Sequence, residues 1–306
     1  MMRHLLSIED LDRAAIERVL ERARSFQELS GREIKKVPAL RGRTVVNLFY
    51  EASTRTSSSF ELAAKRLSAD VVSVRSAGSS VEKGESLRDT VQTLSAYDPA
   101  AIVIRSPFAG TAAQVTAWTD AAVVNAGDGK HEHPTQALLD VFTLTQALGG
   151  LEGKRIWIVG DVLHSRVARS NIIAFSRMGA EVTVCGPPTL LPRQVEALGC
   201  RVQVTLADLH QADVVYVLRM QHERMHEAYV PSLREYAQRY QVRLTSLRPG
   251  QLLMHPGPVN RGVEVSAEAI DSDVSLVGAQ VKSGVAVRMA VLYELLAGSP
   301  ALQAVA

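Results

Sequence analysis

The stretch TVVNLFYEASTRTSSSFELAAKRL, Thr44–Leu67, decides the fold class, because an apolar strand runs directly into an amphipathic helix. Ser53 can cap that helix, whose first turn holds Thr54, Arg55 and Thr56. Free N–H groups, the positive end of the helix dipole, hydroxyls and a guanidinium would converge there. We therefore expect a phosphate site. A Ser/Thr-rich helix start with a solvated Arg55 is the alternative.

The same strand-then-helix pattern repeats along most of the chain. Besides 44–50, strands are expected at 70–74, 100–106, 121–127, 154–161, 181–187, 201–204 and 212–219. Helical patterns follow several of them, at 57–67, 84–97 and 165–179. Buried strands that alternate with helices predict an α/β fold. We expect two domains, each a mainly parallel sheet flanked by helices, linked by interdomain helices.

One of these interdomain helices is expected over 134–148. Pro134 suits its first turn, and Gly149 and Gly150 suit its end. The domain boundary is placed at its start. The expected domains are then 1–134 and 135–284, with a C-terminal helix over 285–306 packing back on the first.

The two terminal helices carry their own start signals. Ser7, with Asp10 three residues on, is typical of a capping box that opens the first helix. The last helix is expected to follow Gly284. Both helices would then belong to the first domain.

The balance of charges excludes one class of function. The chain has 34 Lys and Arg against 32 Asp and Glu, a formal net charge of +2. A dedicated nucleic-acid binder would carry a clear basic excess, so we expect no nucleic-acid partner. The basic residues are mostly arginine, which suits planar recognition of phosphate and carboxylate, although a GC-rich coding sequence gives the same bias.

The cysteine count and the distribution of apolar residues indicate the cellular compartment. Cys185 and Cys200 are too few for a disulfide framework and lie in no metal-binding spacing. No apolar run approaches the roughly 18 residues that span a bilayer, and the N-terminus carries acidic residues where a signal peptide is apolar. We expect a cytoplasmic protein with no membrane partner.

Two further segments of the first half carry candidate residues. The polar loop 76–90 holds Ser79 and Lys83 and is long enough to reach outward, although a mobile surface loop is the commoner explanation. Arg105 stands at the carboxyl end of a buried strand, where open parallel sheets bind ligands. A solvated charge at a strand end is the alternative for Arg105.

The segment GDGKHEHPTQ, 127–136, places His131 and His133 in a loop before a helix, with Gln136 in the first turn. A neutral imidazole there can polarise a substrate carbonyl. Metal ligation by the two histidines is the alternative. We expect no metal and no cofactor, because no further cluster of Cys, His and carboxylates completes a ligand set.

Strand ends of the second half supply the remaining candidates. Gly160 stands alone where a dinucleotide-binding GxGxxG needs three glycines, so no pyrophosphate cradle is expected. Arg166 begins the next helix, and Arg219 and Gln221 follow a buried strand. The Pro/Gly-dense segment 253–262 is stiff and suited to presenting backbone carbonyls, although a plain tight turn has the same composition. These arginines and those of the first half imply a polyanion site at the cleft between the domains.

In combination, these motifs resemble the aspartate carbamoyltransferase family over essentially the whole chain. The matching segments are STRT at 53–56, SSVEKGES at 79–86, HPTQ at 133–136, Arg166, RMQ at 219–221 and HPGP at 255–258. Ornithine carbamoyltransferases share STRT but carry Cys where this chain has Thr135. The resemblance implies transfer of the carbamoyl group of carbamoyl phosphate to the amine of L-aspartate. The products would be N-carbamoyl-L-aspartate and phosphate, an early step of de novo pyrimidine biosynthesis.

The resemblance also implies residue roles. The catalytic residues would be Arg55, Thr56, Arg105 and His133. Carbamoyl phosphate would bind Ser53, Thr54, Arg55, Thr56, Ser79, Lys83, Arg105, His133, Gln136, Pro256 and Gly257. Aspartate would bind Lys83, Arg166, Arg219 and Gln221. Glu51 and Arg224 match positions that family members use for inter-domain pairing in the closed state.

The same resemblance implies a homotrimer with shared active sites, because Ser79 and Lys83 would enter the neighbouring subunit's site. Two residues depart from the family pattern. Ser57 stands where many members have Arg or Lys, and Gly257 replaces the Leu of HPLP. The segment HPGPVNRGVEV looks like the branch that often works with dihydroorotase. A dihydroorotase or a regulatory chain is therefore left open as a partner.

Two alternatives to this function stay open at this point. The chain could carbamoylate another amine, such as ornithine, or it could be a catalytically silent scaffold that binds a dihydroorotase partner. The phosphate-site residues of 53–56 are all present, which speaks against the silent scaffold.

Overall fold

The computed structural model describes residues 2–29, 31–75, 84–221 and 229–297. The chain forms two compact units: unit 1 comprises Met1–Phe142 with Lys282–Ala306, and unit 2 comprises Thr143–Val281. The chain passes into unit 2 within helix α5 (Pro134–Leu148) and returns within helix α9 (Val277–Leu296). The boundary expected after residue 134 and the division after residue 142 both lie in α5.

The sheet of unit 1 has the strand order β2-β1-β3-β4, and its neighbouring strands run parallel. Its strands are β1 (Thr44–Phe49), β2 (Asp70–Arg75), β3 (Ala101–Ser106) and β4 (Ala122–Asp128). Its helices are α1 (Arg13–Leu29), α2 (Thr54–Arg66), α3 (Leu87–Ser95) and α4 (Thr111–Val115), with a 3-10 turn at Pro38–Leu40. Because the strands are parallel, their carboxyl ends share one edge of the sheet, where ligands bind in open α/β sheets.

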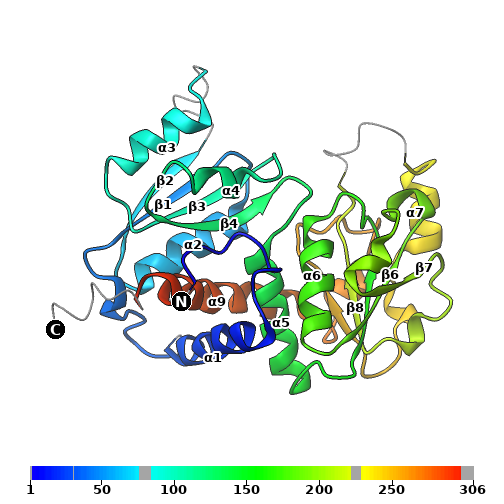
Figure 1. The fold of residues 1–306 in the computed structure, drawn as a ribbon. Coiled ribbons are helices and arrows are strands. Elements are labelled where there is room, and N and C mark those ends of the chain that lie inside the picture. The colour runs from blue at the N-terminus through cyan, green and yellow to red at the C-terminus, as the bar shows by residue number, and fades with distance from the viewer. Residues whose placement is uncertain (1, 30, 76–83, 222–228, 298–306) are drawn as a thin grey trace. The chain divides into compact units, whose positions relative to one another are not determined.

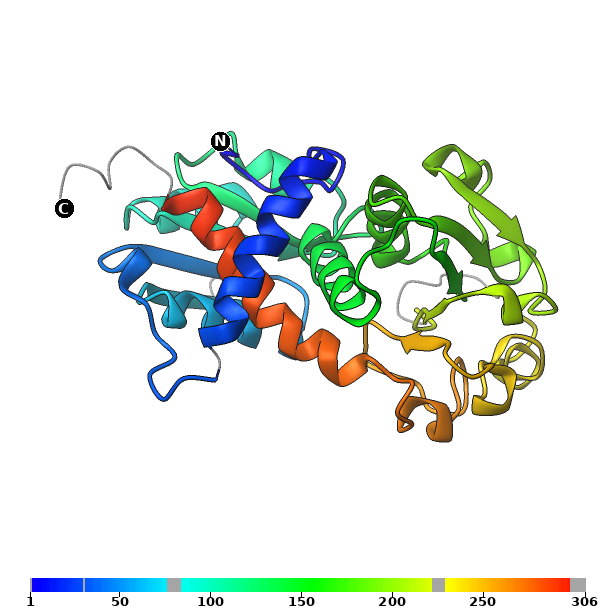
Figure 2. The same ribbon diagram turned by 90° about the horizontal axis from the view of Figure 1, so that it is seen from below.

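Helices cover both faces of this sheet. Val46 and Leu48 pack against Val91 of α3 and Val115 of α4 on one face. On the other face lie α2, α1 and α9, the last two side by side (Figures 1 and 2). The rings of Phe26 in α1 and Tyr293 in α9 meet edge to face at 5.7 Å between centroids. The C-terminal helix therefore belongs to the core of unit 1.

The first helix does not begin where the sequence predicts. The capping-box expectation for Ser7 is wrong, because α1 starts at Arg13 and Asp12 Oδ1 accepts the N–H of Ala15 at 2.7 Å. Ser7 Oγ instead donates to the carboxylate of Glu132, far along the chain. The same Oγ accepts the N–H of Glu9 at 2.9 Å, so Ser7 orders the segment before the helix and does not cap the helix itself.

The last helix also begins earlier than the sequence predicts. It starts at Val277 and contains Gly284, whereas a start after Gly284 was expected. A Cβ on Gly284 would lie 2.6 Å from Nη1 of Arg288, so glycine leaves room for that guanidinium. Residues 298–306, the end of the expected helix, lie outside the described residues.

The sheet of unit 2 has the order β7-β6-β5-β8-β9, and its neighbouring strands are also parallel. Its strands are β5 (Arg155–Val159), β6 (Glu181–Cys185), β7 (Cys200–Gln203), β8 (Val214–Val217) and β9 (Leu252–Met254). Its helices are α6 (Arg166–Arg177), α7 (Leu233–Tyr240) and α8 (Ala267–Ile270). Short 3-10 turns occur at Pro188–Leu190, Val195–Leu198, Leu209–Gln211 and Leu244–Ser246.

Helices cover both faces of the unit 2 sheet. Phe175 of α6 contacts Tyr216 of β8 on one face, and Trp157 and Val215 pack against Ile270 of α8 on the opposite face. The predicted class, two parallel sheets flanked by helices, is confirmed.

An ion-pair cluster at the amino end of this sheet makes the stability of unit 2 pH-dependent. Partial burial alone would raise the pKa of Asp213, but the N–H of Arg155 and the guanidiniums of Arg155 and Arg248 outweigh it. The pKa is therefore held below its ordinary value of 3.8. A lowered carboxyl pKa contributes stability above the unfolded pKa, and that stability is lost as pH falls through the folded value.

We expect Asp213→Asn to lower the free energy of unfolding at pH 7, with the difference from wild type shrinking as the pH falls below 3.8. The effect should be modest, because Asp213 is partly exposed and solvent screens the pair. Urea unfolding at pH 7 and pH 3 measures it. Asp273→Asn, at an exposed position of the same unit, is the control. An equal difference from wild type at both pH values would contradict the assignment.

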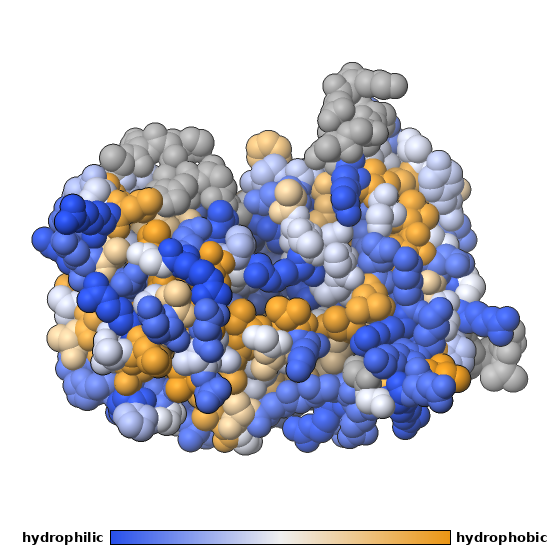
Figure 3. All heavy atoms as spheres, turned by 180° about the vertical axis from the view of Figure 1, so that it is seen from behind, coloured by the Kyte–Doolittle hydropathy of each residue, from blue (hydrophilic) through white to orange (hydrophobic). Residues whose placement is uncertain are grey.

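The surface shown in Figure 3 mixes hydrophilic with apolar residues, as on ordinary globular proteins. No helix in the described parts of the chain is both long and apolar enough to cross a membrane. Cys185 and Cys200 are both buried and unbridged.

Candidate active site

Helix α2 begins where the sequence predicts a phosphate site. Ser53 has an extended backbone, and its Oγ accepts a hydrogen bond from the N–H of Thr56 at 3.3 Å. Thr54 and Arg55 are exposed in the first turn, whereas Thr56 is buried. First-turn N–H groups have no partner inside their own helix, and the helix dipole is positive there. The capped start is confirmed, and this end of α2 can bind an anion.

Loss of this cap should cost measurable stability. We expect Ser53→Ala to lower the free energy of unfolding by about 1 kcal/mol, because one first-turn N–H loses its acceptor. Urea unfolding without substrate measures the change. Ser58→Ala, at an exposed position of the same helix, should stay within about 0.5 kcal/mol of wild type. Equal free energies of unfolding for Ser53→Ala and Ser58→Ala would show that Ser53 does not stabilise the helix as a cap.

Arg105 lies near the carboxyl end of β3, level with Phe49 at the end of β1. Its Nε donates to Oε2 of Glu51 at 3.1 Å, and its Nη1 donates to the carbonyl of Ala126 at 3.5 Å. Glu51 stands two positions before Ser53, a separation of at most about 7 Å. The ion pair therefore ties the Arg105 guanidinium to the segment that leads into α2. We refer to Arg105 and the start of α2 together as the anion-binding corner, because both offer positive charge to an anion.

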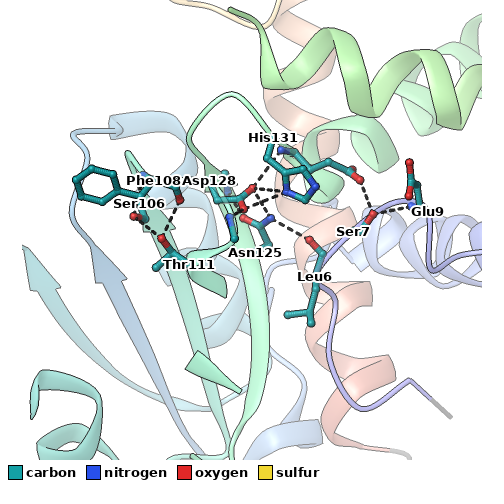
Figure 4. A network of polar contacts seen from close by, with 12 residues as sticks. Leu6, Ser7, Glu9, Ser106, Phe108, Thr111, Asn125, Asp128 and His131 are labelled. Atoms are coloured by element: carbon teal, nitrogen blue, oxygen red, sulfur yellow. Dashed lines mark hydrogen bonds and ion pairs between the residues drawn. The ribbon is translucent and has the colours of Figure 1, made fainter. Parts of the chain in front are cut away.

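The loop between β4 and α5 is fixed by the carboxylate of buried Asp128 (Figure 4). This carboxylate accepts hydrogen bonds from the N–H of Gly110 at 2.7 Å and of Glu132 at 3.1 Å, and from Nδ2 of Asn125 at 2.9 Å. Nδ1 of His131 lies 3.1 Å from it. His131 is thus held by the loop itself through Nδ1.

A second buried carboxylate ties this loop to the N-terminal segment (Figure 4). Glu132 accepts hydrogen bonds from the hydroxyl of Ser7 and from the N–H of Ile8, the latter at 3.0 Å. The tight turn also requires glycine at Gly129, where φ is +48° and a Cβ would lie 2.6 Å from the nitrogen of Ala109. These contacts fix the backbone that leads into His133.

His133 and Gln136 flank the start of α5, as the sequence predicts. Both side chains are buried, and the carbonyl of His133 accepts the N–H of Gln136 at 2.9 Å. Nε2 of Gln136 donates to Oδ1 of the fully buried Asp140 at 3.1 Å. Among the described residues, no group of three or more His, Cys, Asp or Glu side chains could hold a metal ion.

Sequence reasoning missed the buried guanidinium of Arg288, which lies on α9. Its Cζ stands 5.1 Å from the ring centroid of Phe60 in α2. Burial, and then the charge of Arg105, lower the pKa of Arg288, while the carboxylate of Asp140 opposes them. A single Arg in the apolar stretch VAVRMAV was the only signal available. Arg288 is thus a buried cation that lies near enough to Arg105 for the two positive charges to interact.

In unit 2, three candidate segments follow the carboxyl ends of neighbouring strands. The register pairs Val159 of β5 with Val217 of β8, and Tyr216 of β8 with Met254 of β9. The segments 160–166, 218–221 and 255–258 therefore leave the same edge of the sheet. No strand was expected at 252–254, so the sequence alone does not place Pro256 and Gly257 beside the segment that holds Arg219.

Arg166 is the first residue of α6, as predicted. The side chain of Ser165 caps this helix by accepting the N–H of Ala168 at 3.1 Å. The Arg166 side chain is only 3% exposed. A buried guanidinium beside a helix N-terminus favours a carboxylate or phosphate ligand.

Asp161, which sequence reasoning also missed, links two of the three segments. Its Oδ2 accepts the N–H of Gln221 at 3.3 Å, and its Oδ1 lies 2.8 Å from Nδ1 of His164. Asp161 and His164 are fully buried, whereas Arg219 and Gln221 are half-buried. The position of Asp161 directly after a strand, in GDVLH, was the available signal.

Three residues of the expected set lie outside the described residues. They are Ser79, Lys83 and Arg224. Of the proposed inter-domain pair, only Glu51 is therefore described, and it pairs with Arg105 within unit 1.

Each of the two parallel α/β units has arginines and a capped helix start at the carboxyl edge of its sheet, an arrangement typical of α/β proteins that bind small anions there. The chain belongs to the aspartate/ornithine carbamoyltransferase family. The carbamoyl-P binding domain profile of that family matches residues 3–146, and its Asp/Orn binding domain profile matches residues 152–295. The family expected from the sequence motifs is confirmed.

Curated relatives are similar over nearly the whole chain. The aspartate carbamoyltransferase catalytic subunit of Salinispora arenicola is 54% identical, over 98% of this chain and 99% of that one. The subunit of the same name from Kineococcus radiotolerans is 55% identical, over 97% and 98% respectively.

Solved structures share the fold. Aspartate transcarbamoylase from Trypanosoma cruzi, in complex with N-(phosphonacetyl)-L-aspartic acid, superposes with a TM-score of 0.87 at 30% identity, over 96% of each chain. The catalytic subunit of M. jannaschii aspartate transcarbamoylase gives a TM-score of 0.83 at 34% identity, over 96% of this chain and 98% of that one.

Proposed function

We propose that this chain transfers the carbamoyl group of carbamoyl phosphate to the amine of L-aspartate, giving N-carbamoyl-L-aspartate and phosphate. The names of its relatives denote this reaction, and we place it as an early step of de novo pyrimidine biosynthesis. The observation that carries the proposal is the Ser53-capped start of α2, with the Arg105 guanidinium held close to it through Glu51. A dianionic phosphate fits that corner because N–H groups, a helix dipole and a guanidinium converge there.

The roles of the unit 1 residues follow from the charge that each offers. Ser53, Thr54, Arg55 and Thr56 would hold the phosphate, which leaves as the product. Thr56, Arg105 and His133 would stabilise the oxyanion that develops on the carbamoyl oxygen. Gln136, whose amide is oriented by Asp140, would accept a hydrogen bond from the carbamoyl amine through its oxygen.

The unit 2 residues would bind aspartate. Arg166, Arg219 and Gln221 offer guanidiniums and an amide to its two carboxylates. The backbone carbonyl of Pro256 would accept from the carbamoyl amine. Lys83 and Ser79 complete the set through the resemblance alone.

The chemical step is direct acyl transfer. The aspartate nitrogen forms a bond to the carbamoyl carbon, the carbon–oxygen bond to phosphate breaks, and the amine proton passes to the departing phosphate. Positioning of two reactants contributes up to ~7–11 kcal/mol, and one well-placed oxyanion donor contributes ~3–4 kcal/mol. These contributions need only groups that this chain offers.

Phosphate release measured with carbamoyl phosphate and L-aspartate tests the proposal, with L-ornithine as the competing amine. We expect turnover with aspartate and none with ornithine. Turnover with ornithine alone would contradict the assignment of Arg166 and Arg219 to a dicarboxylate. Absence of turnover with either amine, in protein that is folded, would leave the silent scaffold as the function.

The assembly proposed with this function is a homotrimer with shared active sites. Light scattering should then give three times the chain mass of 33.2 kDa. Mixed trimers of Arg105→Ala and Lys83→Gln chains should regain activity, because some sites then draw both wild-type residues from different chains. A monomeric mass or the absence of complementation would contradict it. Dihydroorotase and a regulatory chain stay open as additional partners, and co-purification tests them.

The proposed location is the cytoplasm. The two unbridged, buried cysteines support a reducing compartment. Fractionation of source cells, followed by the phosphate-release assay, would locate the activity.

A further inference from the structure

The fully buried ring of His255 closes a turn at the end of β9. Its Nδ1 accepts a hydrogen bond from the N–H of Gly257 at 2.8 Å. A ring nitrogen that accepts must carry a lone pair, so the hydrogen bond places the proton of the imidazole on Nε2. Nε2 lies 3.2 Å from Oε1 of Glu264, to which it donates. The contacts therefore define one neutral tautomer of His255.

Glu264 holds both ends of this turn. Its Oε1 also accepts the N–H of Asn260 at 2.6 Å, so one carboxylate oxygen fixes residues 255 and 260 together. The N–H of His255 donates to Oε1 of Gln280 at 3.1 Å, which anchors the turn to α9. The segment 255–260 is thus fastened at its start, at Gly257 and at its end.

Stability alone does not explain a carboxylate in this place. Glu264 is fully buried, and its Oε2 has no hydrogen-bond partner among the described residues. Burial, and then the charges of Glu264 and Asp161, raise the pKa of the neighbouring Tyr236. Taking a carboxylate out of water costs several kcal/mol, and well-packed apolar residues of similar volume are often as stable. The arrangement instead gives the turn one defined geometry.

The fixed turn contains the backbone that the proposed function uses. Gly257 has φ +65°, a conformation that favours glycine, and Pro256 precedes it. The Gly257 N–H bond to His255 spans this peptide, so it sets the orientation of the Pro256 carbonyl. A misplacement of about 1 Å at such a carbonyl can cost about 100-fold in rate.

We propose that His255 and Glu264 are positioning residues for this enzyme, because the Glu264-oriented neutral imidazole aims the Pro256 carbonyl at the carbamoyl amine. The inference rests on the proposed function. Neither side chain touches the reacting atoms. Both act through the backbone of 256 and 257.

Two substitutions at one position separate the two contacts of His255. In His255→Asn the side-chain oxygen can accept the N–H two residues on, as in an Asx turn, but cannot reach Glu264. In His255→Gln the longer side chain can reach Glu264 but leaves Gly257 without its acceptor. We expect His255→Gln to lower kcat/KM for carbamoyl phosphate about 10- to 100-fold, and His255→Asn to lower it less.

Glu264→Gln and a surface control complete the set. Glu264→Gln keeps an acceptor for Asn260 but removes the charge that orients the imidazole, and it should fall between wild type and His255→Gln. Arg261→Gln breaks the exposed ion pair with Asp271 in the same segment and should leave kcat/KM unchanged. Binding of inorganic phosphate should match wild type in every variant, because its contacts lie in unit 1.

The outcome is read from kinetics together with hydrogen exchange at the Gly257 amide. The proposal is supported if His255→Gln shows weaker protection of the Gly257 amide and a lower kcat/KM than wild type, while His255→Asn keeps most of the wild-type protection and kcat/KM. Wild-type kcat/KM in a folded, phosphate-binding His255→Gln would overturn it. If His255→Gln and His255→Asn lose kcat/KM equally and also lose phosphate binding, His255 and Glu264 have only a structural role, and the proposal is overturned. If wild type does not carbamoylate aspartate, the proposed function fails, while the exchange pattern at Gly257 still tests the positioning of the turn.

Discussion

Replacement of Arg105 by alanine is expected to lower kcat by about 10²- to 10³-fold, the largest loss of any single substitution at the anion-binding corner. The guanidinium would contact both the phosphate and the developing oxyanion, so its removal weakens the transition state more than the bound substrate. The KM for carbamoyl phosphate should rise as well. Steady-state phosphate release at saturating aspartate measures both constants.

Arg13→Ala is the matched control for this substitution. Arg13 Nε pairs with Glu17 at 3.0 Å, much as Arg105 Nε pairs with Glu51 at 3.1 Å, but the Arg13 pair is exposed on α1. The same chemical change at Arg13 should leave kcat and KM unchanged. Near-normal turnover of Arg105→Ala at saturating substrate would show that Arg105 is not the oxyanion donor.

Local signals in the sequence predicted the elements that form the anion-binding corner. The apolar run ending at Phe49, the cap at Ser53 and the glycines after Leu148 act within a few residues of one another, so they need no knowledge of distant partners. The same holds for Arg105 and Arg166, because each marks the junction of a strand or helix that its own neighbours define.

Long-range contacts account for what the sequence did not predict. The sequence pattern predicted that Ser7 caps a helix, but its hydroxyl donates a hydrogen bond to Glu132, 125 positions away in the chain. Strand β9 spans only Leu252–Met254, too short for a periodicity to appear, so the position of His255 beside the end of β8 could not be foreseen.

The sequence also did not predict which charged residues are buried. Arg288 sits in an apolar stretch of α9, and Asp161 follows a strand without any motif of its own. Their burial depends on side chains that fold against them from other elements, such as Phe60 and His164. A sequence pattern reports which face of a helix is apolar, but not which single charge that face encloses.

Replacement of Arg166 by alanine is expected to raise the KM for aspartate by about 10²- to 10³-fold, with little change in the KM for carbamoyl phosphate. Charge-assisted hydrogen bonds contribute about 1.5–3 kcal/mol each, and a guanidinium can make two to one carboxylate. Arg166→Lys keeps the charge but loses the planar fork, so its KM should lie between those of wild type and Arg166→Ala. Initial rates over a range of aspartate concentrations give these constants.

Arg169→Ala separates this specific role from a general effect on α6. Arg169 lies three residues further along the same helix but is exposed, whereas Arg166 is buried beside the Ser165 cap. A loss of charge at Arg169 should therefore leave aspartate binding as it is. Because Arg166 lies in unit 2 and the residues proposed to hold phosphate lie in unit 1, Arg166→Ala should still bind inorganic phosphate as wild type does. An unchanged KM for aspartate in Arg166→Ala, or an equal rise in Arg169→Ala, would show that the buried guanidinium does not recognise the substrate carboxylate.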